Sequence, residues 1–458
     1  MYSIKRFCAF IPFTFYASHC FSQTPVSLRE LLVQVERHAP ALLTDSAAVR
    51  IRQTQAEATA YNWLPSLKLS YQTDIGTNNN LPGGYFSYGI VPGNSRVQTD
   101  ANTSTLLTDL GIAAFSWEIC NFGAYAAQRN VASSDMEIEQ ARLTLSRYKL
   151  QAATIDNYLR LCQLQELLTV QLNNITRNEE IKRSIEALAT AGVRAGVDTS
   201  IAEAELSKAT LNYIDLRNML RRTQLQLSAL SGLDTGRLIA DTAVIRQFPE
   251  LFPPIDNWSA DAANNPFVLP FELSYKNSLN RESLVRRSYN PKITLDAAAW
   301  SRGSSLTPTG DFRSLPTGFG FERNNYLVGV GFVYNIFDLK RKQLQLRVQK
   351  ATTDYVARQL QEQRSALSLQ LNSINADLAT CMQRLELIPV QLEAANAAYR
   401  QKLALYRNGL TDILELNAAI NLLYRAETDA ILARYKYSET LLQRVVTEGR
   451  LQELVNLL

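Results

Sequence analysis

Four short segments of the chain alternate apolar and polar residues with a period of two, the pattern of a β-strand that has one apolar and one polar face. The pattern predicts strands at residues 65–76, 105–119, 291–300 and 325–336. The residues assigned to their apolar faces are Leu67, Leu69, Tyr71 and Ile75, then Leu106, Leu110, Ile112 and Ala114, then Ile293, Leu295, Ala297 and Ala299, and finally Tyr326, Val328, Val330, Phe332 and Tyr334. Each segment is about as long as the 9–11 residues that a tilted strand needs to cross a bilayer.

Elsewhere, apolar residues recur every three or four positions, as they do on one face of an α-helix. The two longest such stretches are residues 124–191 and 340–408, and only Pro389 interrupts the second. At 1.5 Å per residue, each would be a helix roughly 100 Å long, a length typical of coiled coils. Shorter helices are predicted at residues 27–62, 199–231, 267–288 and 412–447.

The order helix, strand, strand, long helix, return helix occurs twice, which indicates an internal two-fold repeat. The repeats cover residues 23–231 and 265–447. A proline-bearing linker at 232–264 separates them, and a tail at 448–458 follows. Pro65 and Pro291 occupy the same place at the entry to the first strand of each repeat.

The N-terminus has the features of a secretory signal peptide, predicted at residues 1–22. Lys5 and Arg6 precede an apolar run from Phe7 to Ala17. Cleavage is expected near Ser22, and a lipid anchor on Cys20 is the alternative. Three cysteines, Cys120, Cys162 and Cys381, remain after the signal peptide, and an odd number at scattered positions does not imply a disulfide framework. Cys162 and Cys381 lie within helical apolar patterns, so we interpret them as small buried side chains.

Composition argues against nucleic-acid binding and against catalysis. Among 458 residues, 47 basic and 43 acidic side chains give a net charge of +4, without a basic run that would suggest a nucleic-acid partner. The chain has 2 histidines and shows no phosphate-binding loop, nucleophile elbow or metal-ligand cluster. We therefore expect no enzymatic activity, no cofactor and no metal site.

The number of strands predicts an oligomer. After residue 23, no segment approaches the roughly 18 apolar residues of a spanning helix, so any membrane crossing is expected to use the strands. Four strands cannot close a barrel, because the smallest membrane barrels have about eight. Unpaired strand edges in lipid cost several kcal/mol per polar group, so copies of the chain must pair edge to edge. Two, three or four copies satisfy this requirement.

The alternative to a membrane protein is a secreted or periplasmic coiled-coil scaffold or adhesin. That alternative explains the long helices but leaves the four strands unexplained.

The chain resembles the TolC family of outer-membrane channel proteins, the exit ducts of efflux pumps and type I secretion systems. The resemblance rests on Leu64-Pro65-Ser66-Leu67, on Trp117 with Asn121-Phe122-Gly123, and on Gly409-Leu410-Thr411-Asp412-Ile413-Leu414-Glu415. Leu339-Lys340 stands where the family often has an apolar residue and glycine. The fold that the resemblance implies is a mixed α and β membrane protein. In that fold, three chains would form one 12-stranded β-barrel in the outer membrane of a Gram-negative-type bacterium, continued by a long periplasmic α-helical coiled-coil barrel.

The resemblance also implies a function and partners. The homotrimer would passively conduct small molecules or polypeptides from the periplasm to the exterior. It would contact outer-membrane lipid, a periplasmic adaptor protein and an inner-membrane pump of the RND, ABC or MFS type. The turns between the long and return helices would be the periplasmic tips. Adaptor contact is expected there at Gly192, Arg194, Gly196, Arg407, Gly409 and Leu410.

Acidic residues at these turns are candidates for a periplasmic gate that sets ion selectivity. Asp412 and Glu415 match acidic positions of the family, but Asp412-Ile413-Leu414-Glu415 is also a capping box, and both roles are compatible. Asp198 has the corresponding place in the first turn, where helix capping is the favoured interpretation. Tyr406 resembles a family tyrosine that holds the tip closed by hydrogen bonds, and simple packing is the alternative.

Overall fold

The computed structural model describes residues 25–77, 79, 100–192, 195–242 and 265–457. The predicted signal peptide with Cys20, and most of the predicted linker, lie outside the described residues. The chain divides into two compact units: Met1–Leu43, Ser146–Ala263 and Leu367–Leu458 form unit 1, and Thr44–Leu145 and Asn264–Ala366 form unit 2. Each unit takes segments from both predicted repeats, so a repeat in the sequence does not correspond to one compact unit.

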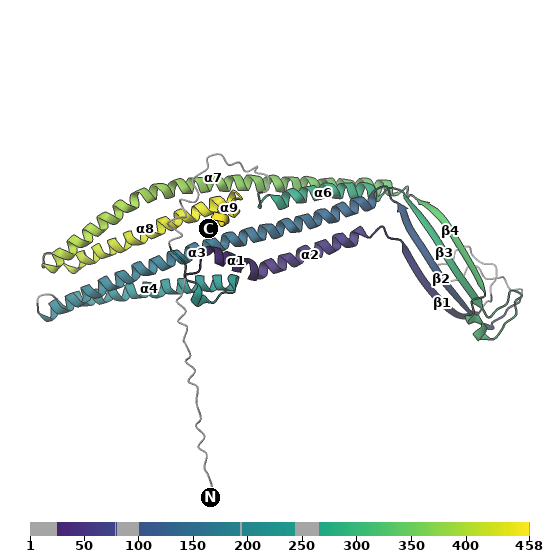
Figure 1. The fold of residues 1–458 in the computed structure, drawn as a ribbon, viewed down its shortest axis with the longest axis horizontal. Coiled ribbons are helices and arrows are strands. Elements are labelled where there is room, and N and C mark those ends of the chain that lie inside the picture. The colour runs from purple at the N-terminus through teal and green to yellow at the C-terminus, as the bar shows by residue number, and fades with distance from the viewer. Residues whose placement is uncertain (1–24, 78, 80–99, 193–194, 243–264, 458) are drawn as a thin grey trace, which may run out of the picture. The chain divides into compact units, whose positions relative to one another are not determined.

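Unit 2 contains an antiparallel sheet in the order β1-β2-β3-β4, which leaves β1 and β4 at its edges (Figure 1). The strands are β1 (Ser66–Thr77), β2 (Thr105–Cys120), β3 (Lys292–Ser304) and β4 (Arg323–Val333). β3 continues beyond its predicted end at residue 300. β4 stops short of residue 336, because the backbone N–H of Asp338 bonds the carbonyl of Asn335 at 3.2 Å and turns the chain toward the next helix.

The strand register corrects one predicted face. Directly opposite residues in an antiparallel pair project to the same side of the sheet. Ile112 lies opposite Ser70, and Ala114 opposite Lys68. The assignment of Leu106, Leu110, Ile112 and Ala114 to the apolar face is therefore wrong, since these residues share the polar face of β1. The apolar face of β2 is the one with Phe115, which pairs with Leu67. We call these sides the polar face and the apolar face of the sheet.

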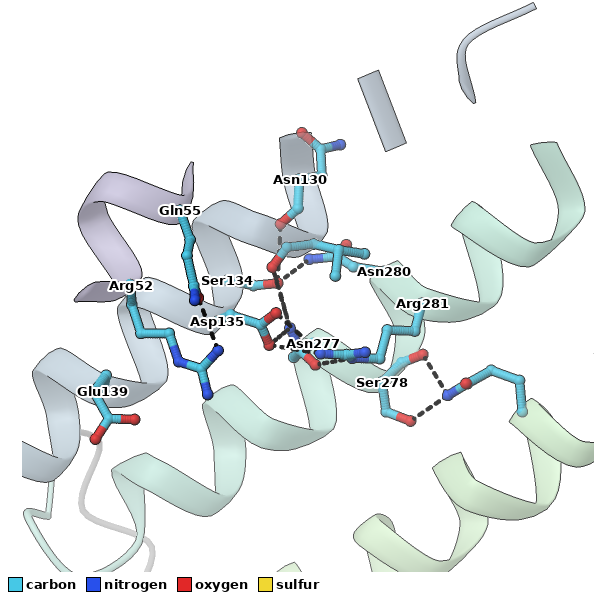
Figure 2. Close-up of polar contacts among 12 residues, drawn as sticks. Arg52, Gln55, Asn130, Ser134, Asp135, Glu139, Asn277, Ser278, Asn280 and Arg281 are labelled. Atoms are coloured by element: carbon cyan, nitrogen blue, oxygen red, sulfur yellow. Dashed lines mark hydrogen bonds and ion pairs between the residues drawn. The ribbon is translucent and has the colours of Figure 1, made fainter. Parts of the chain in front are cut away.

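The helices that accompany the sheet in unit 2 are α2 (Pro40–Ala60), the beginning of α3 (Ala124–Thr190), α6 (Leu269–Ser288) and the beginning of α7 (Asp338–Arg407). A polar network joins α6 to α3. Figure 2 shows the Asn277 amide of α6 donating to Ser134 Oγ at 2.8 Å and to Asp135 Oδ1 at 2.9 Å, both on α3. Arg281 completes the network with an ion pair to Asp135 at 2.8 Å. Because Asn277 and Ser134 are buried, these bonds fix how α6 packs on α3.

Unit 1 is helical. It comprises α1 (Leu28–His38), the remainder of α3, α4 (Gly196–Ser231), the short 3-10 helix η1 (Thr235–Arg237), the remainder of α7, α8 (Ile413–Thr447) and α9 (Leu451–Leu457). In the described part of the chain, no helix is both long enough and apolar enough to cross a membrane.

The prediction of one helix at residues 27–62 is wrong, because the chain breaks between α1 and α2. Ala39 is extended, with φ −63° and ψ 117°, and Pro40 opens α2. A proline disfavours helical geometry in the residue before it, yet suits the first position of a helix. Pro389, in contrast, lies inside α7 without ending it.

The buried Tyr158 side chain of α3 links this helix to the N-terminal segment. The Tyr158 hydroxyl donates to the carbonyl of Val26 at 3.0 Å and accepts from the backbone N–H of Asp241 at 2.9 Å. Burial raises the pKa of Tyr158 to about 12. Val26 also forms a parallel bridge with Ala240. The start of the described chain is therefore anchored by both side-chain and backbone bonds.

We expect Cys162 to be unreactive in the folded protein. Its side chain is fully buried, and burial raises the pKa of its thiol to about 12. The nucleophilic thiolate is therefore nearly absent at pH 8. Maleimide treatment at that pH, followed by mass mapping of peptides, should modify Cys162 only after urea unfolding. Equal labelling with and without urea would contradict its burial.

Candidate functional site at the two helical turns

Two helical turns lie in unit 1 and share one apolar core, which we call the tip core. The first turn joins α3 to α4, and the second joins α7 to α8. The tip core draws on all four helices, and its buried members are Ile181, Ile185, Ala202, Tyr406, Ile413, Leu416 and Ile420. The two turns are therefore packed as one body rather than as separate hairpins.

The second turn has the geometry of a Schellman motif. Gly409 takes a left-handed conformation, with φ 75°. The backbone N–H of Gly409 bonds the carbonyl of Tyr406 at 3.0 Å, and that of Leu410 bonds the carbonyl of Leu405 at 2.9 Å. These bonds satisfy the last carbonyls of α7, and glycine tolerates the positive φ that they require.

The two acidic residues of the second turn have different partners. Asp412 is the N-cap of α8, and its carboxylate accepts from the backbone N–H of Glu415 at 2.9 Å. The Glu415 carboxylate accepts instead from Lys402 Nζ of α7 at 2.8 Å. Asp412 therefore makes its half of the predicted capping box. The Glu415 side chain forms an ion pair with Lys402 across the turn instead of bonding back to the backbone N–H of Asp412. Both acidic residues are exposed to solvent.

The first turn differs from its prediction at Asp198. α4 begins at Gly196 rather than at residue 199, with Ala195 as its N-cap and no side-chain cap. The expectation that Asp198 caps this helix is therefore wrong. Asp198 lies inside the first helical turn, where a negative charge still favours the helix dipole. Gly192, with φ 72°, supplies the left-handed residue that ends α3.

The remaining predicted residues divide by exposure. Tyr406 is 2% exposed and belongs to the tip core, which fits the packing interpretation. Leu410 is 73% exposed, and Val197 and Leu414 are 62% and 63% exposed. Arg407 is exposed in the last turn of α7. Arg194 lies outside the described residues. The turns thus present apolar side chains to solvent, which is typical of an interaction surface.

Charged pairs join the helices behind the turns, and sequence reasoning missed them. Arg177 of α3 makes a bidentate ion pair with Glu427 of α8, at 3.1 and 2.5 Å. Lys182 of α3 pairs with Glu203 of α4. No spacing along the sequence announces such pairs, because each partner lies on a different helix. The Arg177–Glu427 pair fixes the first hairpin against the second.

A family model described as outer membrane efflux protein matches residues 31–233 and 260–443. Among curated proteins, none matches the chain significantly. Three solved structures share its fold. The outer-membrane channel OprN has 19% identity and a TM-score of 0.72, with 92% of this chain and 89% of that chain covered. The Campylobacter jejuni CmeC outer membrane channel has 13% identity and a TM-score of 0.73, covering 92% and 85%. The open state of the Neisseria gonorrhoeae MtrE channel has 16% identity and a TM-score of 0.67, covering 92% and 88%.

Proposed function

The chain belongs to the outer membrane efflux protein family, and from this membership we propose how its copies assemble and which partners they meet. It is an outer-membrane channel protein of the efflux type, rather than a soluble scaffold or adhesin. We propose that three copies form one duct, with a 12-stranded β-barrel continued by the long helices. The duct conducts solutes passively, and energy comes from its partners.

The open edges of the sheet carry this proposal. In the described chain, β1 and β4 each pair on one side only. Apolar side chains on both edge strands are exposed, including Leu69 at 78% and Val330 at 71%. An exposed apolar face is costly for a lone chain in water, and unpaired strand edges are costly for it in lipid. Pairing β4 of one copy with β1 of the next removes both edges, and a lipid environment covers the apolar face.

Electrophoresis and conductance together test the assembly. Unboiled outer-membrane extracts should give a trimer band that heating converts to a monomer, and the purified trimer should conduct ions in planar bilayers. A monomer recovered from the soluble periplasmic fraction would contradict the proposed duct.

The helical turns are the proposed periplasmic tips, where the duct meets a periplasmic adaptor protein and, through it, an inner-membrane pump of the RND, ABC or MFS type. The exposed apolar side chains Val197, Leu410 and Leu414 suit such a contact. Whether the cargo is a small molecule or a polypeptide follows from the pump. In the same assembly, three copies of Asp412 and Glu415 place six carboxylates around the periplasmic entrance. Because Lys402 pairs with Glu415, the net negative charge that favours cations comes mainly from Asp412.

Removing charge at the second turn without removing its cap tests the gate. Serine caps helices about as well as aspartate, so Asp412→Ser with Glu415→Gln keeps the cap and eliminates both charges. We expect a lower cation-to-anion permeability ratio and weaker block by divalent cations in planar bilayers. Asp198→Ser removes one acid from the first turn, and it should change selectivity less than the double variant does. Unchanged selectivity in an intact trimer would leave Asp412 with its capping role alone.

A further inference from the structure

Two arginines face each other at the loop-bearing end of the sheet. Arg302 of β3 lies directly opposite Arg323 of β4, and both are exposed. The same row continues through Leu110 to Gln72, so both arginines lie on the polar face. Like charges directly opposite one another destabilise a sheet by roughly 0.2–1 kcal/mol. The pair therefore has no structural advantage unless an anion bridges it.

Some of the charges near the helix-bearing end of the polar face are satisfied by neighbours. Near the opposite end, Lys292 pairs with Glu118 at 2.8 Å, and Asp296 accepts from Ser116 and Thr294 at 2.7 Å each. Within the described chain, neither Arg302 nor Arg323 has an ion-pair partner. Arg302 and Arg323 are therefore adjacent positive charges without a counter-charge partner in the described chain.

The acids around this end of the sheet do not supply the missing partner. Glu322 pairs with Arg313 at 2.7 Å, and Asp311 accepts from Thr309 at 2.6 Å. Asp74 of β1 accepts from Gln72, with two 3.0 Å contacts, and lies on the far edge of the sheet. The connection between β1 (ending at Thr77) and β2 (beginning at Thr105) contains one arginine, Arg96, and one acid, Asp100. The sequence of that connection therefore adds no net charge, and no ion pair joins Asp100 to Arg302 or Arg323 within the described chain.

We propose that Arg302 and Arg323 bind oxyanionic groups, such as phosphate or carboxylate, at the outer mouth of the duct. The site rests on the proposed function, because the trimer would bring six such guanidinium groups around one opening. Planar guanidinium groups match oxyanions with two parallel hydrogen bonds, and two of them side by side can hold a multivalent anion. Solutes that carry phosphate or carboxylate would therefore be retained at the exit more strongly than neutral ones.

Equilibrium binding of inorganic pyrophosphate to the purified full-length protein tests the site by calorimetry. The double variant Arg302→Gln/Arg323→Gln should bind at least about tenfold more weakly than the wild type, because it loses charge-assisted hydrogen bonds. The control Arg313→Gln removes a nearby arginine that is already paired, and it should bind like the wild type. Equal affinity of the double variant, or no binding by the wild type, would overturn the inference.

Two further measurements separate this inference from its premises. In planar bilayers, pyrophosphate added on the loop side should reduce the wild-type current more than that of the double variant. A protein that binds pyrophosphate but carries no current would contradict the duct and leave the anion site standing. Phosphatidylcholine nanodiscs with and without phosphatidylglycerol identify the natural source of the anion. If pyrophosphate binds equally well with and without phosphatidylglycerol, the arginines bind a solute. If phosphatidylglycerol weakens pyrophosphate binding, the arginines face lipid, and their placement at the mouth of the duct is overturned.

Discussion

Replacing Gly303 by alanine is expected to displace the loop that connects β3 to β4, which packs against β2 and β3. Gly303 of β3 lies opposite Asp109, and a Cβ atom at this position would overlap the carbonyl oxygen of Gly320 and the carboxylate of Asp109. One of these neighbours is backbone, so it cannot move without shifting the segment that contains the short 3-10 helix η2 (Leu315–Phe319). Overpacking of this kind costs about 1–3 kcal/mol, and a backbone obstacle places the cost at the upper end.

Trypsin cleavage after Arg313 measures this displacement locally. We expect faster cleavage in Gly303→Ala than in the wild type, together with a lower thermal unfolding midpoint. Gly329→Ala is the matched control, because Gly329 is also a strand glycine but has no neighbouring atom within 4 Å of the place that a Cβ atom would take. If both variants resist trypsin equally, the close packing of the loop on β2 and β3 is incorrect.

The second large effect is expected at the Arg177–Glu427 pair. The two side chains are 15% and 25% exposed, so Arg177→Met leaves a mostly buried carboxylate without its partner. Breaking such a pair costs about 3–5 kcal/mol when fully buried, and about 2–3 kcal/mol is expected at this exposure. Urea unfolding followed by circular dichroism measures the loss, because unit 1 is helical.

A double-mutant cycle shows whether the effect belongs to the pair. Arg177→Met/Glu427→Met should be less destabilised than the sum of the single variants, since it leaves no unpaired charge. Lys436→Met supplies the comparison, because Lys436 and Glu439 are 49% and 39% exposed. Exposed pairs contribute about 0–1 kcal/mol. Strict additivity in the cycle would mean that the two side chains act independently.

Alternation along the sequence is a reliable signal for strands only where one face is distinctly polar. On β1, Lys68 and Ser70 define the polar face without ambiguity. On β2, the run from Leu110 to Phe115 contains no polar side chain. Either set of alternate residues could therefore be assigned to the apolar face, and no polar residue would show that the assignment is wrong. Pairing with β1 decides the face, and the sequence of β2 alone does not contain that information.

At the turns, the sequence predicts interactions correctly where the two partners are close in sequence. Gly409 indicates a helix end in the left-handed conformation, and Asp412 indicates an N-cap that accepts from the backbone N–H three residues ahead. The capping-box pattern predicts that the Glu415 side chain bonds the backbone N–H of Asp412. It bonds Lys402 of the preceding helix instead, because a charged donor makes a stronger hydrogen bond to a carboxylate than a backbone N–H does. The sequence predicts Asp198 as a cap because it predicts that the return helix starts at residue 199, whereas α4 starts at Gly196. Interactions between helices were the part that sequence reasoning missed.

The composition of the tip core also sets the order in which unit 1 can fold. Ile181 and Ile185 belong to α3, whereas Leu416 and Ile420 belong to α8, far later in the chain. Contacts of such high sequence separation form slowly, because a long loop must close before they are made. During synthesis the N-terminal part of the chain is made first. The apolar side chains of α3 therefore remain exposed to solvent until α8 has been synthesised and packs against them. This interval is when the nascent protein is most exposed to aggregation, and when a holding chaperone has the most to protect.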